Sequence, residues 1–164
     1  MRYGQIRQYD VANGTGIRTS LFVTGCTHNC KGCFNQLYMD FNHGDEWTDR
    51  ETRKLLDYLR EPVIEGLTVL GGEPFQNVEG LLPVLKLVRE QVDKSIWIYS
   101  GYTWEELVTD PERLEMLKLC DVLVDGRFVQ ELFHPSLAFR GSENQRIIEV
   151  AASMETGTLR LMFE

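Results

Sequence analysis

Short runs of consecutive apolar residues recur along the chain, and several of them end at glycine. Such runs are typical of strands buried on both faces of a parallel sheet. The pattern predicts strands at Leu21–Val23, Leu67–Leu70, Ser95–Tyr99, Val122–Val124 and Arg146–Val150.

Segments with helical spacing of apolar residues lie between these runs, and most begin with a recognisable cap. The predicted helix starts are Thr48 with Glu51, Asn77, Thr103 with Glu106, and Asp110 followed by Pro111. Alternation of strands and helices predicts a parallel sheet with right-handed crossovers. A closed eight-stranded barrel typically needs about 250 residues. The 164 residues of this chain therefore predict one α/β domain over residues 1–164, an open partial barrel of about five to six mostly parallel strands.

The composition narrows the function classes. The net charge is -8 at pH 7, and an acidic chain repels phosphate backbones, so we expect no nucleic-acid partner. The N-terminus lacks the apolar stretch of a signal peptide. No apolar run reaches the length of a membrane span. We therefore expect a cytoplasmic protein without a membrane partner.

Three of the four cysteines, Cys26, Cys30 and Cys33, lie in one loop directly after the first predicted strand. The carboxyl end of a strand is where α/β folds place their sites. Cysteine thiolates hold cubane iron–sulfur clusters, usually four at a time. Three ligands would leave one iron atom of a [4Fe–4S] cluster free for a small molecule. Cys120 stands apart and is interpreted as a small buried apolar residue.

Other interpretations of the cysteines exist. Structural zinc could take Cys120 or His28 as a fourth ligand, but zinc sites usually pair their ligands two by two. A thiol redox pair at Cys30 and Cys33 would normally open a helix. Incidental buried cysteines are a third alternative.

A second motif, Gly71-Gly72-Glu73-Pro74, follows the second predicted strand. Glycines let backbone approach a ligand closely, and a nearby carboxylate favours an ammonium group. Alone, this segment would be an ordinary turn. Together with the cysteine loop at the same edge of the sheet, it indicates a ligand site.

The C-x3-C-x2-C loop and the Gly-Gly-Glu segment resemble the radical S-adenosylmethionine (SAM) superfamily. Gly32 before Cys33 and Phe34 after it are similar to one of its glycyl-radical-activating families, the activating proteins of anaerobic ribonucleoside-triphosphate reductase. The resemblance spans about residues 5 to 148. Further segments that resemble this family are Asn13–Arg18, Asp121–Phe128 and Phe139–Gln145.

The resemblance implies a radical SAM type of fold and an oxidoreductase that cleaves SAM at a [4Fe–4S] cluster held by Cys26, Cys30 and Cys33. It implies that the enzyme makes a glycyl radical on the large subunit of the anaerobic reductase, with an electron donor such as flavodoxin. No catalytic side chain is implied beyond the cluster and the SAM site. The SAM contacts that it implies lie around Gly32, Cys33, Phe34, Gly71, Gly72 and Glu73.

Some residues have no assigned role. His28, His43 and His134 need none in such a mechanism and are expected to be surface or packing residues. Asn13 replaces an aspartate of the pyruvate formate-lyase activator, so that enzyme's peptide-binding role is not transferred to it. Asp125 is expected either to contact SAM or to cap a turn. No motif identifies a function for the tail after Val150.

Three rival functions share part of the pattern. A pyruvate formate-lyase activator type or a 7-carboxy-7-deazaguanine synthase type would contain the same cysteine loop. A non-catalytic iron–sulfur or zinc protein would need no SAM site and would leave the Gly-Gly-Glu segment unexplained.

Overall fold

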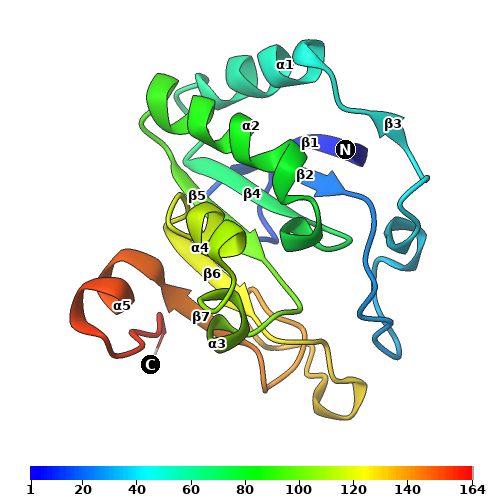
Figure 1. Ribbon diagram of the computed structural model, residues 1–164, viewed down its shortest axis with the longest axis vertical. Helices are drawn as coiled ribbons and strands as arrows, with labels where there is room; N and C mark the ends of the chain where they lie inside the picture. The colour runs from blue at the N-terminus through cyan, green and yellow to red at the C-terminus, as the bar shows by residue number, and fades with distance from the viewer. Residues whose placement is uncertain (164) are drawn as a thin grey trace.

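Four of the five apolar runs form the parallel centre of one sheet in the computed structural model, which describes residues 1–163 (Figure 1). They are β2 (Arg18–Val23), β4 (Gly66–Gly71), β5 (Ser95–Tyr99) and β6 (Val122–Asp125). Each pairs with the next in parallel. The apolar runs therefore identified the centre of the sheet correctly.

Helices fill the crossovers between these strands. They are α1 (Asp49–Leu59), α2 (Val78–Gln91), α3 (Trp104–Leu107) and α4 (Pro111–Leu117), with short 3-10 turns at Gln36–Met39, Pro74–Gln76 and Gln130–Leu132. Helices α1, α2 and α4 lie side by side on one face of the sheet (Figure 1). The opposite face is left to loops.

All four predicted helix starts are confirmed. Capping boxes form at Thr48 and Thr103, and Asp110 accepts hydrogen bonds from the first turn of α4, where Pro111 is the first residue. Asn77 is the N-cap residue of α2, but its side chain makes no capping bond. Its amide nitrogen donates instead to the carbonyl oxygens of Thr24 and Glu73, at 3.1 and 3.0 Å. Asn77 thus joins the end of β2 to the turn after β4.

The edges of the sheet differ from the prediction. Strand β1 (Arg2–Asp10) pairs antiparallel with β2 and with β3 (Asp45–Glu46), and β7 (Arg146–Glu149) pairs antiparallel with β6. The order is β3-β1-β2-β4-β5-β6-β7. The sheet is open, as expected. It has seven strands, whereas about five to six were predicted, and the prediction that they would be mostly parallel was wrong. Only the three central pairings are parallel.

The chain continues beyond the last strand. The predicted strand Arg146–Val150 ends at Glu149, and Val150 begins the short helix α5 (Val150–Thr156). Gly157 ends this helix in a left-handed conformation, with φ of 72°. The part of the tail for which no motif was found therefore begins as ordered structure packed against the end of the sheet.

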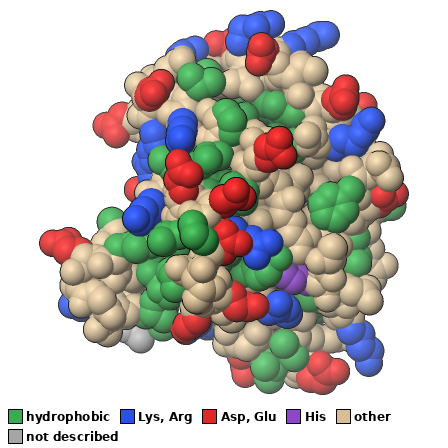
Figure 2. All heavy atoms as spheres, in the orientation of Figure 1, with side chains coloured by type: hydrophobic (Ala, Val, Ile, Leu, Met, Phe, Trp, Pro, Cys, Tyr) green, Lys and Arg blue, Asp and Glu red, His purple; other side chains and the backbone are tan. Residues whose placement is uncertain are grey.

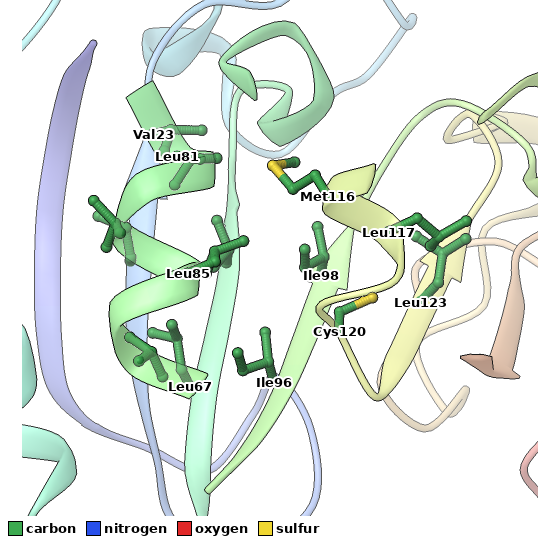
Figure 3. Close-up of a cluster of buried hydrophobic side chains, with 14 of the residues drawn as sticks. Val23, Leu67, Leu81, Leu85, Ile96, Ile98, Met116, Leu117, Cys120 and Leu123 are labelled. Carbon is green, nitrogen blue, oxygen red and sulfur yellow. The ribbon is translucent and has the colours of Figure 1, made fainter. Parts of the chain in front are cut away.

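The main core lies between the sheet and the three covering helices (Figure 3). Leu81 and Leu85 of α2 point at the sheet, as do Met116 and Leu117 of α4, and Ile98 of β5 meets them. Cys120 lies in this core with only 3% of its surface exposed, so the interpretation of Cys120 as a buried apolar residue is confirmed. Burial raises the pKa of its thiol, which keeps it protonated and inert.

On the face drawn in Figure 2, acidic and basic side chains are interspersed, and the basic ones form no continuous area there. Among the described residues, none of the helices has both the length and the apolar character needed to cross a bilayer.

Candidate functional site

The cysteine loop leaves the carboxyl end of β2 and is fixed to the turn at Gln36–Met39. The Gly25 amide donates to the Tyr38 carbonyl oxygen at 2.7 Å, and the Cys26 amide donates to that of Met39 at 3.0 Å. A further turn closes where the Cys33 amide donates to the Cys30 carbonyl oxygen at 3.2 Å. The loop thus has a defined course although it contains no helix or strand.

All three thiols of this loop line one cavity of about 510 Å³ at the carboxyl edge of the parallel strands. Of the other residues predicted for the site, Phe34, Gly71, Gly72 and Glu73 also line it. Gly32 does not; its α-carbon faces the side chain of Gln130, where a Cβ would lie 2.9 Å from the nearest atom. The structure therefore brings all the predicted site residues except Gly32 to one cavity.

The thiols have the chemistry that an iron–sulfur cluster needs. Cys26, Cys30 and Cys33 are unpaired and partly exposed. Burial raises the pKa of the Cys26 and Cys30 thiols, so a metal that binds them must displace protons. Within residues 1–163, no three His, Cys, Asp or Glu side chains are arranged to hold a single metal ion. Each thiolate of a cubane binds a different iron atom, so the thiols fit a cluster without converging on one point.

The glycines after β4 allow two backbone segments to meet. A Cβ on Gly72 would lie 2.6 Å from the Tyr38 carbonyl oxygen and 2.7 Å from that of Gly25. The neighbouring Glu73 amide donates to the Gly25 carbonyl oxygen at 2.7 Å. Gly72 is therefore needed for close contact between the end of β4 and the start of the cysteine loop, whatever ligand lies beside it.

The Glu73 carboxylate is buried, with 1% of its surface exposed, and both oxygens are engaged within the protein. One oxygen accepts from the His28 ring at 2.7 Å and the Gly101 amide at 2.7 Å. The other accepts from the Phe75 amide and the Ser100 hydroxyl, both at 2.9 Å. Glu73 also lines the cavity, and its contact with a ligand's ammonium group stays a prediction.

His28 was expected to lie on the surface or to pack without a role. Its side chain is only 6% exposed and forms the bond to Glu73. It also packs edge-on against Tyr102, with ring centroids 4.6 Å apart. Sequence reasoning missed this residue and its partners Ser100 and Gly101. The available signals were the place of His28 within the cysteine motif and the position of Ser100 and Gly101 directly after a buried strand.

The far wall of the cavity is the long loop 126–145 that joins β6 to β7. Its residues Phe128 and Phe133 pack against Phe34, with ring centroids 4.8 and 5.6 Å apart. Phe34 remains 67% exposed, so these aromatic rings form an open rim. The loop is held at its base by Arg140, which donates to the carbonyl oxygens of Glu143 and Gln145 at 3.2 and 2.6 Å.

Asp125 lies behind this loop and not in the cavity wall. It is 1% exposed, accepts from the Trp104 amide at 2.8 Å, and pairs with Arg146 at 2.6 Å. Of the two roles considered for Asp125, the structure supports capping and organisation of the neighbouring turn.

The segment Asn13–Arg18 ends at the first residue of β2. Asn13 lines the cavity, and its side chain donates to Asp10 at 2.8 Å. The fully buried Arg18 guanidinium donates to the Thr68 hydroxyl at 2.9 Å and to carbonyl oxygens of three other residues. Burial lowers the Arg18 pKa to about 10. These contacts give the motif a structural explanation: Arg18 binds the starts of β4 and β5 together.

Comparison with known proteins agrees with this site. Residues 12–148 match the family model described as a 4Fe-4S single cluster domain. The chain is 46% identical to the anaerobic ribonucleoside-triphosphate reductase-activating protein of Haemophilus influenzae, over 90% of this chain and 97% of the relative. Proteins of the same name from Escherichia coli K12 and Enterobacteria phage T4 are each 38% identical, over 88% and 90% of this chain and 96% and 93% of their own lengths. The chain therefore belongs to the family of anaerobic ribonucleoside-triphosphate reductase-activating proteins.

Proposed function

We propose that this protein is a radical SAM activase that generates a glycyl radical on the anaerobic ribonucleoside-triphosphate reductase. One observation carries the proposal: the three thiols of a C-x3-C-x2-C loop share a cavity with the glycine-rich end of the neighbouring strand β4. The names of the relatives supply the partner.

Cys26, Cys30 and Cys33 would hold a [4Fe–4S] cluster, with one iron atom left to a ligand from outside the chain. When bound, the cluster supplies the electron that cleaves the sulfonium carbon–sulfur bond of SAM, giving methionine and the 5′-deoxyadenosyl radical that takes hydrogen from glycine. The protein's part is to bind the cluster and SAM, to orient them, and to exclude side reactions. SAM would lie along Phe34 and the backbone of Gly71 and Gly72, and Glu73 would shape that backbone.

The cavity also suits a protein substrate. Its rim is open at Phe34 and Phe133, both substantially exposed, so a segment of the reductase can approach from this side. An electron donor such as flavodoxin, which the resemblance implies, and a cytoplasmic location belong to the same proposal.

The related activities are less favoured. Relatives that cover nine tenths of the chain carry the name of the reductase activator, which separates this chain from pyruvate formate-lyase activators and deazaguanine synthases. A non-catalytic cluster protein is less favoured because the relatives carry the name of an activating protein.

The test is an anaerobic reconstitution with iron and sulfide, followed by SAM, a reductant and the reductase of the same organism. We expect 5′-deoxyadenosine and a glycyl doublet in the electron paramagnetic resonance spectrum. The doublet should vanish when the target glycine of the reductase is replaced by alanine. A loaded protein that yields no doublet, or that converts a small metabolite instead, would overturn the proposal.

A further inference from the structure

His28 points inward from the middle of the cysteine loop, although its neighbours Thr27 and Asn29 are exposed. The inward direction brings its Nε2 atom within 2.7 Å of the Glu73 carboxylate. Asn29 adopts a left-handed backbone, with φ of 54°, directly after this buried side chain. The loop therefore turns in a way that buries one histidine and leaves the residues on either side in solvent.

Glu73 connects that histidine to two further segments of the cavity wall. It accepts hydrogen bonds from Phe75 in the turn after β4, and from Ser100 and Gly101 after β5. Hydrogen bonds to a charged group that is shielded from water are among the stronger ones in proteins. The His28–Glu73 bond thus joins the thiol-bearing loop to the ends of two parallel strands, beside the bonds of the Glu73 amide to Gly25 and of the Asn35 side-chain amide to Gly71.

We propose that His28 is a positioning residue that acts through Glu73. Its bond helps to fix the distance between the cysteine loop and the glycine-rich end of β4, and with it the position of the cluster relative to SAM. The inference rests on the proposed function, since it assigns the cluster to the loop and SAM to the strand end. Residues that orient the groups around a metal centre without binding the metal commonly tune its behaviour in this way.

The test compares His28→Ala and His28→Gln with the parent protein, all reconstituted anaerobically. The glutamine amide can still donate a hydrogen bond to Glu73, whereas alanine cannot. His43→Ala is the matched control, because His43 packs against Tyr38 outside the cavity. Each protein is assayed for iron content, for SAM affinity, and for the change that SAM causes in the paramagnetic resonance spectrum of the reduced cluster.

We expect His28→Ala to retain most of its iron but to bind SAM at least tenfold more weakly, with a diminished spectral change. His28→Gln should recover most of the affinity and the spectral change, and His43→Ala should match the parent. In a Glu73→Gln background, His28→Ala should reduce SAM affinity much less than it does in the parent protein. The reason is that Glu73→Gln already weakens the bond that His28→Ala removes. Parent-like SAM affinity and spectrum in His28→Ala, or full additivity with Glu73→Gln, would overturn the inference.

A metal-free measurement covers the case in which His28→Ala fails to load iron. Hydrogen exchange of the cysteine-loop amides in the apoprotein should become faster in His28→Ala and return toward the parent rate in His28→Gln. Unchanged exchange in His28→Ala would overturn the inference. Failure of the proposed function is distinct, because the parent itself would then show no SAM-dependent change in its spectrum.

Discussion

The guanidinium of Arg146, on the last strand, lies 2.6 Å from the buried carboxylate of Asp125 at the end of β6. Arg146 also reaches Glu105 in α3, at 2.7 Å. These bonds raise the pKa of Arg146. One side chain thereby fixes β7, β6 and α3 relative to one another at the base of the loop that forms the far wall of the cavity.

Arg146→Ala should therefore destabilise the fold, because it leaves a buried carboxylate with only its amide donors. A loss of about 2 to 4 kcal/mol is expected from the cost of an unpaired buried charge. Urea unfolding of the apoprotein measures it. The control is Arg127→Ala, which breaks an exposed pair with Glu106 and should cost no more than about 1 kcal/mol. Equal losses in the two variants would contradict the structural role given to Arg146.

Replacing any of Cys26, Cys30 or Cys33 by alanine should abolish the cluster. No other thiol is near enough to substitute, since the fourth cysteine lies in the core. Iron content and the visible absorption of reconstituted protein are the measurements. Cys120→Ala serves as the control and should retain the cluster, at a modest cost in stability from the lost packing. Full loading of Cys30→Ala would be incompatible with the ligand assignment.

Gly72→Ala should impair cluster loading as well as SAM binding. The added methyl group meets two backbone oxygens at less than 3 Å, so the start of the cysteine loop has to shift. Gly157→Ala is a useful comparison, because nothing lies within 4 Å of its Cβ position and only its left-handed backbone is strained. Iron per chain and SAM affinity should fall in the first variant and stay near the parent values in the second. A Gly72→Ala protein with normal iron and SAM binding would show that the close contact is dispensable.

Glu106 provides a prediction on pH. Its hydrogen bond from Arg127, together with the capping bonds to Thr103, lowers its pKa from 4.5 to about 2. A carboxyl whose pKa is depressed by folding adds stability above its unfolded pKa, and that stability is lost as the pH falls from about 4.5 to about 2. Nuclear magnetic resonance of the carboxyl carbon should show this low midpoint, and Arg127→Gln should raise it. A midpoint near 4.5 in the parent protein would contradict the pairing.

The sequence predicted the parallel centre of the sheet because β2, β4, β5 and β6 are largely buried on both faces and so each contain a run of apolar residues. Strand β1 was not predicted, because most of its residues are only half-buried and polar residues are mixed among them. The sequence also did not predict the direction of β7 relative to β6. The loop before it is long enough for a crossover, so only the three-dimensional path of residues 126–145 decides between parallel and antiparallel pairing.

The sequence likewise predicted some features of the candidate site and not others. The thiols and the glycines after β4 were identified because motif spacing constrains them within a few residues. The role of Glu73 was not foreseen, because its partners His28 and Gly101 come from different loops. Which buried donor meets which acceptor depends on how those loops fold together, and spacing along the chain does not determine that.

The two walls of the cavity are made at different times during translation. The cysteine loop leaves the ribosome early, whereas Phe128 and Phe133, which pack against Phe34, are synthesised near the end. Domains generally fold as units while the chain emerges N-terminus first. Until residues 126–145 have been synthesised, the thiols are consequently open on the side that this loop will later cover. A nascent chain thus offers its cysteines to iron delivery, or to oxidation, more freely than the finished protein does.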